Sequence, residues 1–113
     1  METILQETLL YDFYGELLTE KQKTIFELFY QNDLTLTEIA QEEGISRQAV
    51  RDQLKRAEEI LAGYEQKLHL VERFLAQKER DKEMVRLIKA LEEELGPTEK
   101  LKRLSALANA MMD

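Results

Sequence analysis

The chain has 113 residues, of which 43% are hydrophobic and 35% are charged, and its formal net charge is -7 at pH 7. This length suits one domain with at most a helical extension, and a single proline with four glycines favours helices over strands or disorder. The absence of cysteine excludes disulfides, thiolate catalysis and the usual structural zinc sites. We expect an all-α, cytoplasmic protein without a membrane span or a signal peptide.

The first two helices are predicted from apolar spacing and a capping residue. Apolar residues recur at every third or fourth position over about residues 3–16, which is the period of an amphipathic helix. Thr19 is a suitable N-cap for a second helix, and the buried face of that helix is expected between Ile25 and Tyr30.

A helix-turn-helix pattern follows. Thr35 and Glu38 have the spacing of a capping box, so a short third helix is predicted to begin at Leu36. Gly44 ends it, because a residue without a Cβ readily adopts the positive φ of a sharp turn, and Ser46 caps the fourth helix. The residues assigned to the turn and its packing are Ala40, Gly44, Ile45 and Val50. An ordinary helical hairpin has similar offsets, so the pattern alone leaves both interpretations open.

Beyond the turn, apolar residues alternate spacings of four and three, as in a heptad seam. They predict a long fourth helix from Ser46 to about Gln77. Glycine destabilises a helix interior, so we expect either that this helix bends at Gly63 or that packing compensates for the lost stability. The residues assigned to this seam, for dimerisation or packing, are Leu61, Tyr64, Leu68, Val71 and Leu75. We expect a homodimer built on it, with a monomeric bundle as the alternative.

Two further helices are predicted near the end of the chain. One covers residues 82–95 and ends at a Gly-Pro pair, and Thr98 caps the last one. We therefore predict a helix-turn-helix domain over residues 1–62 and a helical extension, with the probable dimerisation region, over residues 63–113.

Basic residues concentrate at the start of the predicted fourth helix. Residues 1–45 carry ten acidic and two basic side chains, whereas residues 46–57 have a net charge of +3 and residues 58–113 a net charge of -2. This segment is the part of a helix-turn-helix protein that enters the major groove of DNA. The residues assigned to nucleic-acid binding are Ser46, Arg47, Gln48, Arg51, Asp52, Lys55 and Arg56. A solvated helix face with local ion pairs is the alternative for each of them.

The stretch from "LTEKQKTIFELFY" through "LTLTEIAQEEGIS" to "RQAVRDQLKRAEEIL" resembles region 4 of bacterial sigma factors. Over its whole length, with "YDFYGELLT" and "GISRQAVRDQLKRAE" as the distinguishing segments, the chain resembles the YlxM family of small proteins of Gram-positive bacteria. The resemblance implies a sigma region 4-like fold and a regulatory or accessory role in the signal recognition particle pathway. It places Arg47, Arg51 and Lys55 at DNA-facing positions, whereas Asp52 has the wrong charge for that surface.

The sequence is therefore consistent with two functions. The first is a DNA-binding regulatory protein with a role in the signal recognition particle pathway. The alternative is an adaptor of that pathway that binds protein or RNA, with weak or no DNA binding. The acidic residues of the first helix, Glu7, Asp12 and Glu16, could dock a basic protein partner. We expect no enzyme, cofactor or metal site, because the sequence has no catalytic motif or metal-ligand cluster and its single histidine, His69, lies in the heptad region.

Overall fold

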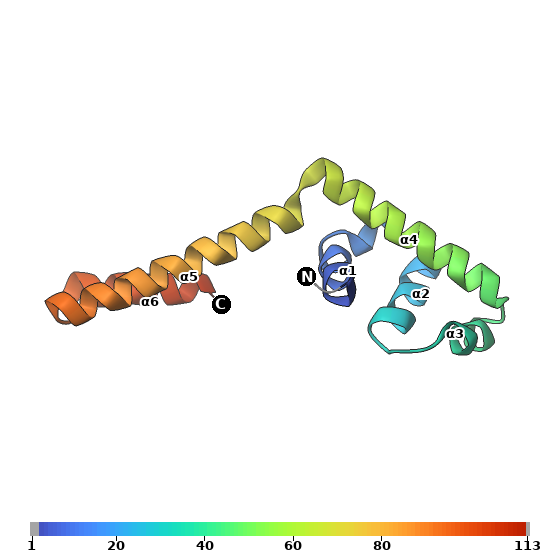
Figure 1. The fold of residues 1–113 in the computed structure, drawn as a ribbon, viewed down its shortest axis with the longest axis horizontal. Helices are drawn as coiled ribbons and strands as arrows, with labels where there is room; N and C mark the ends of the chain where they lie inside the picture. Colours follow the sequence, from blue (N-terminus) through green and yellow to red (C-terminus); the bar gives the residue numbers. More distant parts are fainter. Residues whose placement is uncertain (1–2, 113) are drawn as a thin grey trace. The chain divides into compact units, whose positions relative to one another are not determined.

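The computed structural model describes residues 3–112, which form six α-helices and one 3₁₀ helix and contain no strand. The helices are α1 (Thr3–Tyr14), the 3₁₀ helix η1 (Gly15–Leu17), α2 (Glu20–Tyr30), α3 (Leu36–Glu43), α4 (Arg47–Leu68), α5 (Leu70–Leu95) and α6 (Glu99–Met112) (Figure 1). The prediction of an all-α fold is confirmed. None of the helices within residues 3–112 is both long enough and apolar enough to cross a membrane.

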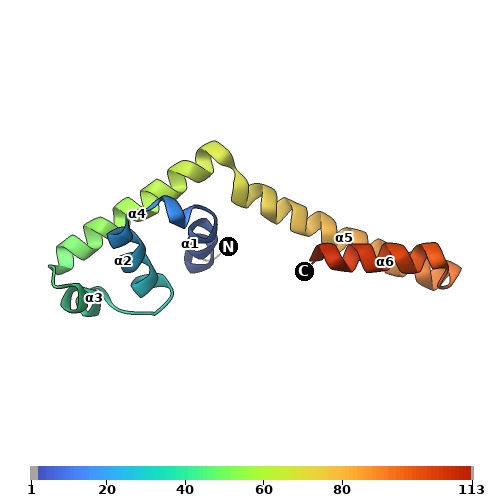
Figure 2. The same ribbon diagram turned by 180° about the vertical axis from the view of Figure 1, so that it is seen from behind.

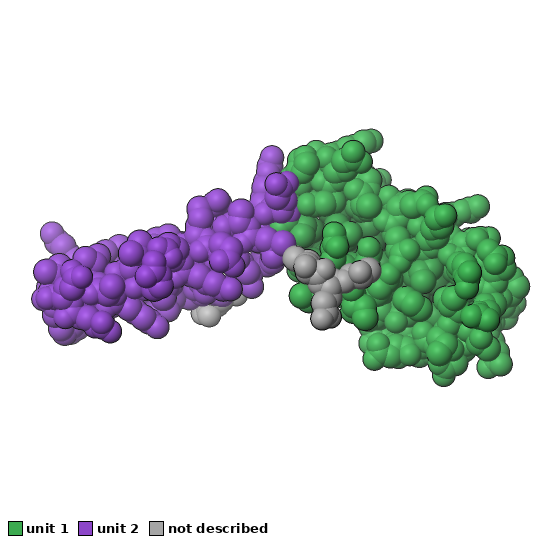
Figure 3. Space-filling model, viewed as in Figure 1, with its two compact units in different colours: residues 1–71 green, residues 72–113 purple. Residues whose placement is uncertain are grey.

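The chain forms two compact units, residues 1–71 and residues 72–113 (Figure 3). The division falls later in the sequence than the expected boundary between residues 62 and 63. The second half of α4 and the first residues of α5 remain part of the first unit, where Leu61 of α4 and Val71 of α5 are both buried.

In the first unit, α4 packs against the three helices that precede it. Figure 2 shows α1, α2 and α3 gathered on one side of α4. Apolar residues of α4 recur at spacings of four and three, so they form one stripe along this side. Removing these side chains from water is the main source of stability for the unit. The largest side chains with less than 2% exposure are Tyr14, Phe26, Ile25, Ile39, Leu61 and Val50.

The predicted capping residues are confirmed. The Thr19 hydroxyl accepts a hydrogen bond from the backbone N–H of Gln22 at 3.2 Å, and the Gln22 side chain accepts one from the Thr19 N–H at 3.1 Å. Thr35 and Glu38 form the same reciprocal pair at 3.1 and 2.9 Å. Each pair satisfies N–H groups that have no partner within the helix, and so fixes where α2 and α3 begin.

The end of α1 differs slightly from the prediction, since the α-helix ends at Tyr14 and continues as the 3₁₀ turn that starts at Gly15. A Cβ on Gly15 would lie 2.9 Å from the ring of Tyr11, which is too close for packed atoms. The glycine therefore leaves room for the Tyr11 ring, which stacks on Phe26 of α2 with ring centroids 4.7 Å apart.

The fourth helix is shorter than predicted. It passes through Gly63 without interruption but ends at Leu68, because His69 adopts the left-handed conformation at φ 57° and ψ 30°. The N–H groups that start α5 are then bound by side chains: the Tyr14 hydroxyl accepts from Leu70 at 3.1 Å, and the Glu65 carboxylate accepts from Val71 at 3.0 Å. The Tyr14 hydroxyl also donates to Glu65 at 2.6 Å.

A single helix from Ser46 to Gln77 with a continuous heptad seam is therefore wrong, and the five seam residues have different environments. Leu61 and Val71 are buried within the first unit, and Tyr64 stacks on Tyr14 at 6.0 Å. Leu68 is exposed and Leu75 is half-buried. The left-handed residue between α4 and α5 breaks the helical period that would have placed all five on one stripe.

The second unit consists of α5 and α6. The helix predicted to begin near residue 82 begins already at Leu70, and α6 begins where predicted, because the Thr98 hydroxyl accepts a hydrogen bond from the N–H of Leu101 at 3.2 Å. Ile88 of α5 and Leu101 and Ala108 of α6 are buried. Since the unit contains no other helix, these residues mark the line along which α5 and α6 pack.

We predict that Tyr14→Phe destabilises the protein. The substitution keeps the buried ring but removes the hydroxyl that binds Glu65 and the Leu70 N–H, so a carboxylate and an amide lose a partner. The expected loss in free energy of unfolding is about 1–3 kcal/mol, measured by urea denaturation.

Phe13→Leu, at an exposed neighbouring position, is the control and should change the free energy of unfolding far less. Equal stability of Tyr14→Phe and the parent protein would contradict the assigned role of the hydroxyl.

Candidate nucleic-acid interface

The turn between α3 and α4 has the geometry of a helix-turn-helix motif. Gly44 lies at φ 67° and ψ 32°, and its N–H donates to the carbonyl of Ala40, as does the N–H of Ile45 at 3.1 Å. The two N–H groups that follow α3 therefore bind the same carbonyl of its last turn, and the chain reverses within two residues. The Ser46 hydroxyl accepts from the N–H of Ala49 at 3.0 Å and so caps α4, as the sequence predicts.

The packing of the turn holds α3 against the first turns of α4. Val50 is fully buried and Ile45 and Ala40 are half-buried, which agrees with the roles assigned to them. Ile39 of α3 is also fully buried, although the sequence analysis did not single it out. Its position one residue before Ala40, on the apolar side of α3, is the signal that could have identified it.

The outer surface of the first turns of α4 carries the assigned nucleic-acid-binding residues, all of which are exposed: Ser46, Arg47, Gln48, Arg51, Asp52, Lys55 and Arg56. Within residues 3–112, the side chains of Arg47, Arg51, Lys55 and Arg56 form no ion pair and no hydrogen bond. Local ion pairs with Asp52 or Glu59 do not form. These four cations, hereafter the basic surface, are therefore available to an anionic ligand.

Of the three other residues assigned to nucleic-acid binding, Ser46 caps α4, and Gln48 and Asp52 bind one another. The side-chain amide of Gln48 donates to the carboxylate of Asp52 at 3.0 Å. This bond fixes the direction of Gln48 and occupies one oxygen of the only acidic side chain in the segment. Arg47, Gln48 and Arg51 line an open hollow at the start of the helix.

The acidic residues of the first unit are distributed differently from the basic surface. The Tyr11 hydroxyl donates to Glu27, and the Tyr30 hydroxyl donates to Glu58 of α4. Burial and the bond to Glu58 raise the pKa of Tyr30. These two half-buried carboxylates connect helices of the first unit and are bound by tyrosine hydroxyls, unlike the basic surface.

The three acidic residues proposed as a docking surface on α1 do not lie together. Glu7 is half-buried, and one of its carboxylate oxygens is buried without a hydrogen-bond partner among the described residues. Burial and the nearby charge of Glu58 raise the pKa of Glu7. Asp12 and Glu16 are exposed, and Glu16 pairs with Lys23 at 3.0 Å.

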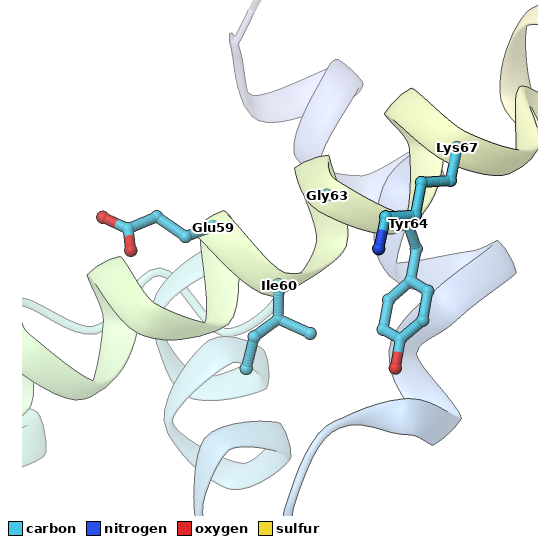
Figure 4. Close-up of a pocket in the computed structure, with 5 residues that line it drawn as sticks. All are labelled: Glu59, Ile60, Gly63, Tyr64 and Lys67. Atoms are coloured by element: carbon cyan, nitrogen blue, oxygen red, sulfur yellow. The ribbon is translucent and has the colours of Figure 1, made fainter.

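A second hollow lies on α4 over Gly63, with a volume of about 270 Å³. Figure 4 shows Ile60 and Tyr64 directed to one side of the helix and Glu59 directed away from them. Its volume is below the range of about 300–1,000 Å³ that is typical of small-molecule sites. It brings Glu59 and Lys67 to its edge but contains no nucleophile, and no group of three or more potential metal ligands occurs within residues 3–112.

Comparison with known proteins connects this geometry to a family. Residues 1–103 match the family described as "Putative helix-turn-helix protein, YlxM / p13 like". Among curated relatives, a UPF0122 protein of Thermoanaerobacter pseudethanolicus is 45% identical, with 80% of this chain and 93% of the relative covered. The UPF0122 protein of Desulforamulus reducens is 46% identical over 79% of this chain and 76% of the relative. That of Caldanaerobacter subterraneus is 61% identical over 58% of this chain and 56% of the relative.

The environment of Glu7 generates a prediction about pH. Because the pKa of Glu7 is raised in the folded protein, the folded state holds this proton more tightly than the unfolded state, and stability falls as the pH rises through the raised pKa. Glu7→Gln, which stays neutral, should therefore be more stable than the parent protein at pH 7. The difference should disappear below the ordinary value of 4.5.

Urea unfolding midpoints measured from pH 4 to pH 8 would test this prediction. Glu42→Gln, at an exposed position on α3, is the control and should follow the parent protein throughout. A Glu7→Gln variant that is less stable at pH 7 would show that the carboxylate has a partner that stabilises its charge.

Proposed function

Since the chain belongs to the UPF0122 family of YlxM/p13-like helix-turn-helix proteins, we propose that it is a regulatory protein that binds DNA through the start of α4. The observation that carries the proposal is the basic surface: its four cations are exposed on the helix after the turn and lack any intramolecular partner within residues 3–112. The helix-turn-helix family is typical of non-enzymatic regulators. The protein would act in the cytoplasm.

The residues of α4 have separate roles in this proposal. Arg47 and Arg51 reach guanine edges or phosphates, and Lys55 and Arg56 contact phosphates further along the helix. Asp52 suits a base edge rather than the backbone, because a carboxylate can accept a hydrogen bond from the amino group of cytosine but repels phosphate.

The net negative charge of the protein lowers its affinity for DNA but does not prevent the basic surface from contacting DNA. At physiological ionic strength the Debye length is about 8 Å, so acidic groups on the far side of the first unit are screened from a phosphate at Arg47 or Arg51. Non-specific affinity increases with the number of phosphates neutralised, and four cations neutralise few. Binding should therefore depend strongly on base contacts and on pairing of two chains, and we propose that the protein acts as a homodimer through residues 63–113.

An adaptor of the signal recognition particle pathway is the second candidate. Asp12 is exposed on α1 without an ion-pair partner within residues 3–112, and Glu16 is exposed nearby, so this side of α1 suits a basic protein partner. The pathway itself is inferred from the resemblance to the YlxM family. Because one carboxylate oxygen of Glu7 is buried, the acidic docking surface on the first helix is smaller than the sequence predicts.

Substitution of two arginines tests the role of the basic surface. Arg47→Ala/Arg51→Ala should remove most DNA binding while the protein remains folded, because both side chains are exposed and pack against no core residue. If both contact phosphates, the slope of log K against log salt should become less steep by roughly 1.8. Filter binding or anisotropy with selected DNA, measured from 50 to 200 mM salt, provides both values.

The matched control is Arg73→Ala/Arg80→Ala, which removes two exposed arginines from α5 and should leave DNA affinity within about twofold. Unchanged nucleic-acid binding in Arg47→Ala/Arg51→Ala would reject the assigned surface.

The adaptor is tested by pull-down from the organism's own lysate after DNase treatment. If the adaptor is correct, proteins or RNA of the signal recognition particle remain bound, and Asp12→Lys reduces their recovery several-fold. Glu42→Lys on α3 is the control for an equal change in charge. Recovery of DNA alone, with none of these components, would count against the adaptor.

A further inference from the structure

The α5–α6 hairpin leaves many large apolar side chains uncovered. Buried residues of the hairpin such as Ile88 and Leu101 are 7% exposed, whereas seven others are between 41% and 67% exposed. These seven, hereafter the apolar face, are Met84, Leu87, Leu91 and Leu95 of α5 and Leu104, Leu107 and Met111 of α6. Soluble monomers rarely expose a contiguous apolar surface of this kind.

The residues of the apolar face lie on the same side of the hairpin. At 100° per residue, the exposed residues of α5 lie roughly 20–100° around the helix from the buried Ile88, and those of α6 lie roughly 60–120° around the helix from the buried Leu101. The offset has the same rotational sense in both helices. Because a short connection makes α5 and α6 antiparallel, offsets of the same sense bring the two stripes to one side of the pair.

We propose that the apolar face of a second copy of this chain covers this one, so that two hairpins form a four-helix bundle. Two helices alone cannot enclose residues that face away from their mutual contact, whereas four helices enclose them in a central core. This inference gives the proposed homodimer its interface, and it does not depend on DNA being the ligand.

The charges that border the apolar face favour a second copy as the occupant. Glu94 borders it on the α5 side, together with Glu83, whose charge is paired with Arg86 of the same helix, and Arg103 borders it on the α6 side. Glu94 and Arg103 are exposed and form no ion pair within residues 3–112. The surface therefore has one acidic edge and one basic edge, which is the requirement for pairing with itself.

The edges also select one orientation. A two-fold axis along the helices places α5 of one chain beside α6 of the other, so that Glu94 lies near Lys100 and Arg103 of the partner copy. An axis across the helices would instead place α5 against α5, where Glu94 lies opposite the Glu83–Arg86 ion pair of the partner copy and away from its Arg103. Opposite charges favour the first arrangement, with both α5–α6 connections at the same end of the bundle.

Sedimentation equilibrium of the full chain without nucleic acid tests the inference. The parent protein should have the mass of two chains. Leu91→Glu or Leu107→Glu should weaken self-association on the order of a hundredfold, because each buries an unpaired carboxylate in the proposed core. Leu17→Glu, at a similarly exposed position on η1, should remain dimeric. A monomeric parent protein, or a dimer that persists in both hairpin variants, would overturn the inference.

Charge reversal at the edges provides a test that does not disturb the apolar residues. Glu94→Lys and Arg103→Glu should each weaken the dimer, and the double variant should restore it. Single variants without effect, or a double variant weaker than either, would contradict the orientation. Because no DNA is present, these experiments measure self-association alone, and Arg47→Ala/Arg51→Ala, which should lose DNA binding, should keep the mass of two chains.

Discussion

The architecture depends on the hydrogen bonds of one buried hydroxyl. The Tyr14 oxygen donates to Glu65 on α4 and accepts from the N–H of Leu70, and Glu65 in turn accepts from Val71. These bonds satisfy the start of α5 at the place where His69 ends α4 in a left-handed conformation. Without them the apolar period would favour one longer helix. With them, the end of α4 and the first residues of α5 belong to the first unit, and the rest of α5 pairs with α6.

The same unit uses its acidic and basic residues in opposite ways. Glu27 and Glu58 accept hydrogen bonds from Tyr11 and Tyr30, so these carboxylates hold helices together beside stacked aromatic rings. Each hydroxyl compensates part of the cost of removing a carboxylate from water. The arginines and lysine at the start of α4 have no such bonds within residues 3–112. A strongly acidic sequence can therefore present a local cationic surface, because its basic residues at the start of α4 are exposed together and the acidic residues of the first unit other than Asp52 lie elsewhere.

The features that the sequence predicted well are local ones. Thr19, Thr35 and Ser46 cap their helices, and Gly44 turns the chain, because each depends on residues within three or four positions. The exposure of the basic surface followed from helix periodicity. The break at His69 could not be predicted, since histidine is no usual signal for a left-handed residue and the apolar spacing continues across it. Its cause is Tyr14, which lies 51 residues before Glu65 in the chain. The environment of Glu7 was missed for the same reason, because its neighbour Glu58 comes from a distant helix.

Gly63 has a practical consequence for spectroscopy. A Cβ at this position would meet no atom within 4 Å, and the chain has no cysteine of its own. A single cysteine introduced there could carry a fluorophore or a nitroxide without displacing a packed side chain. Because the position lies in the last third of α4, far along the helix from the basic surface, such a label would leave the proposed ligand-binding residues unmodified.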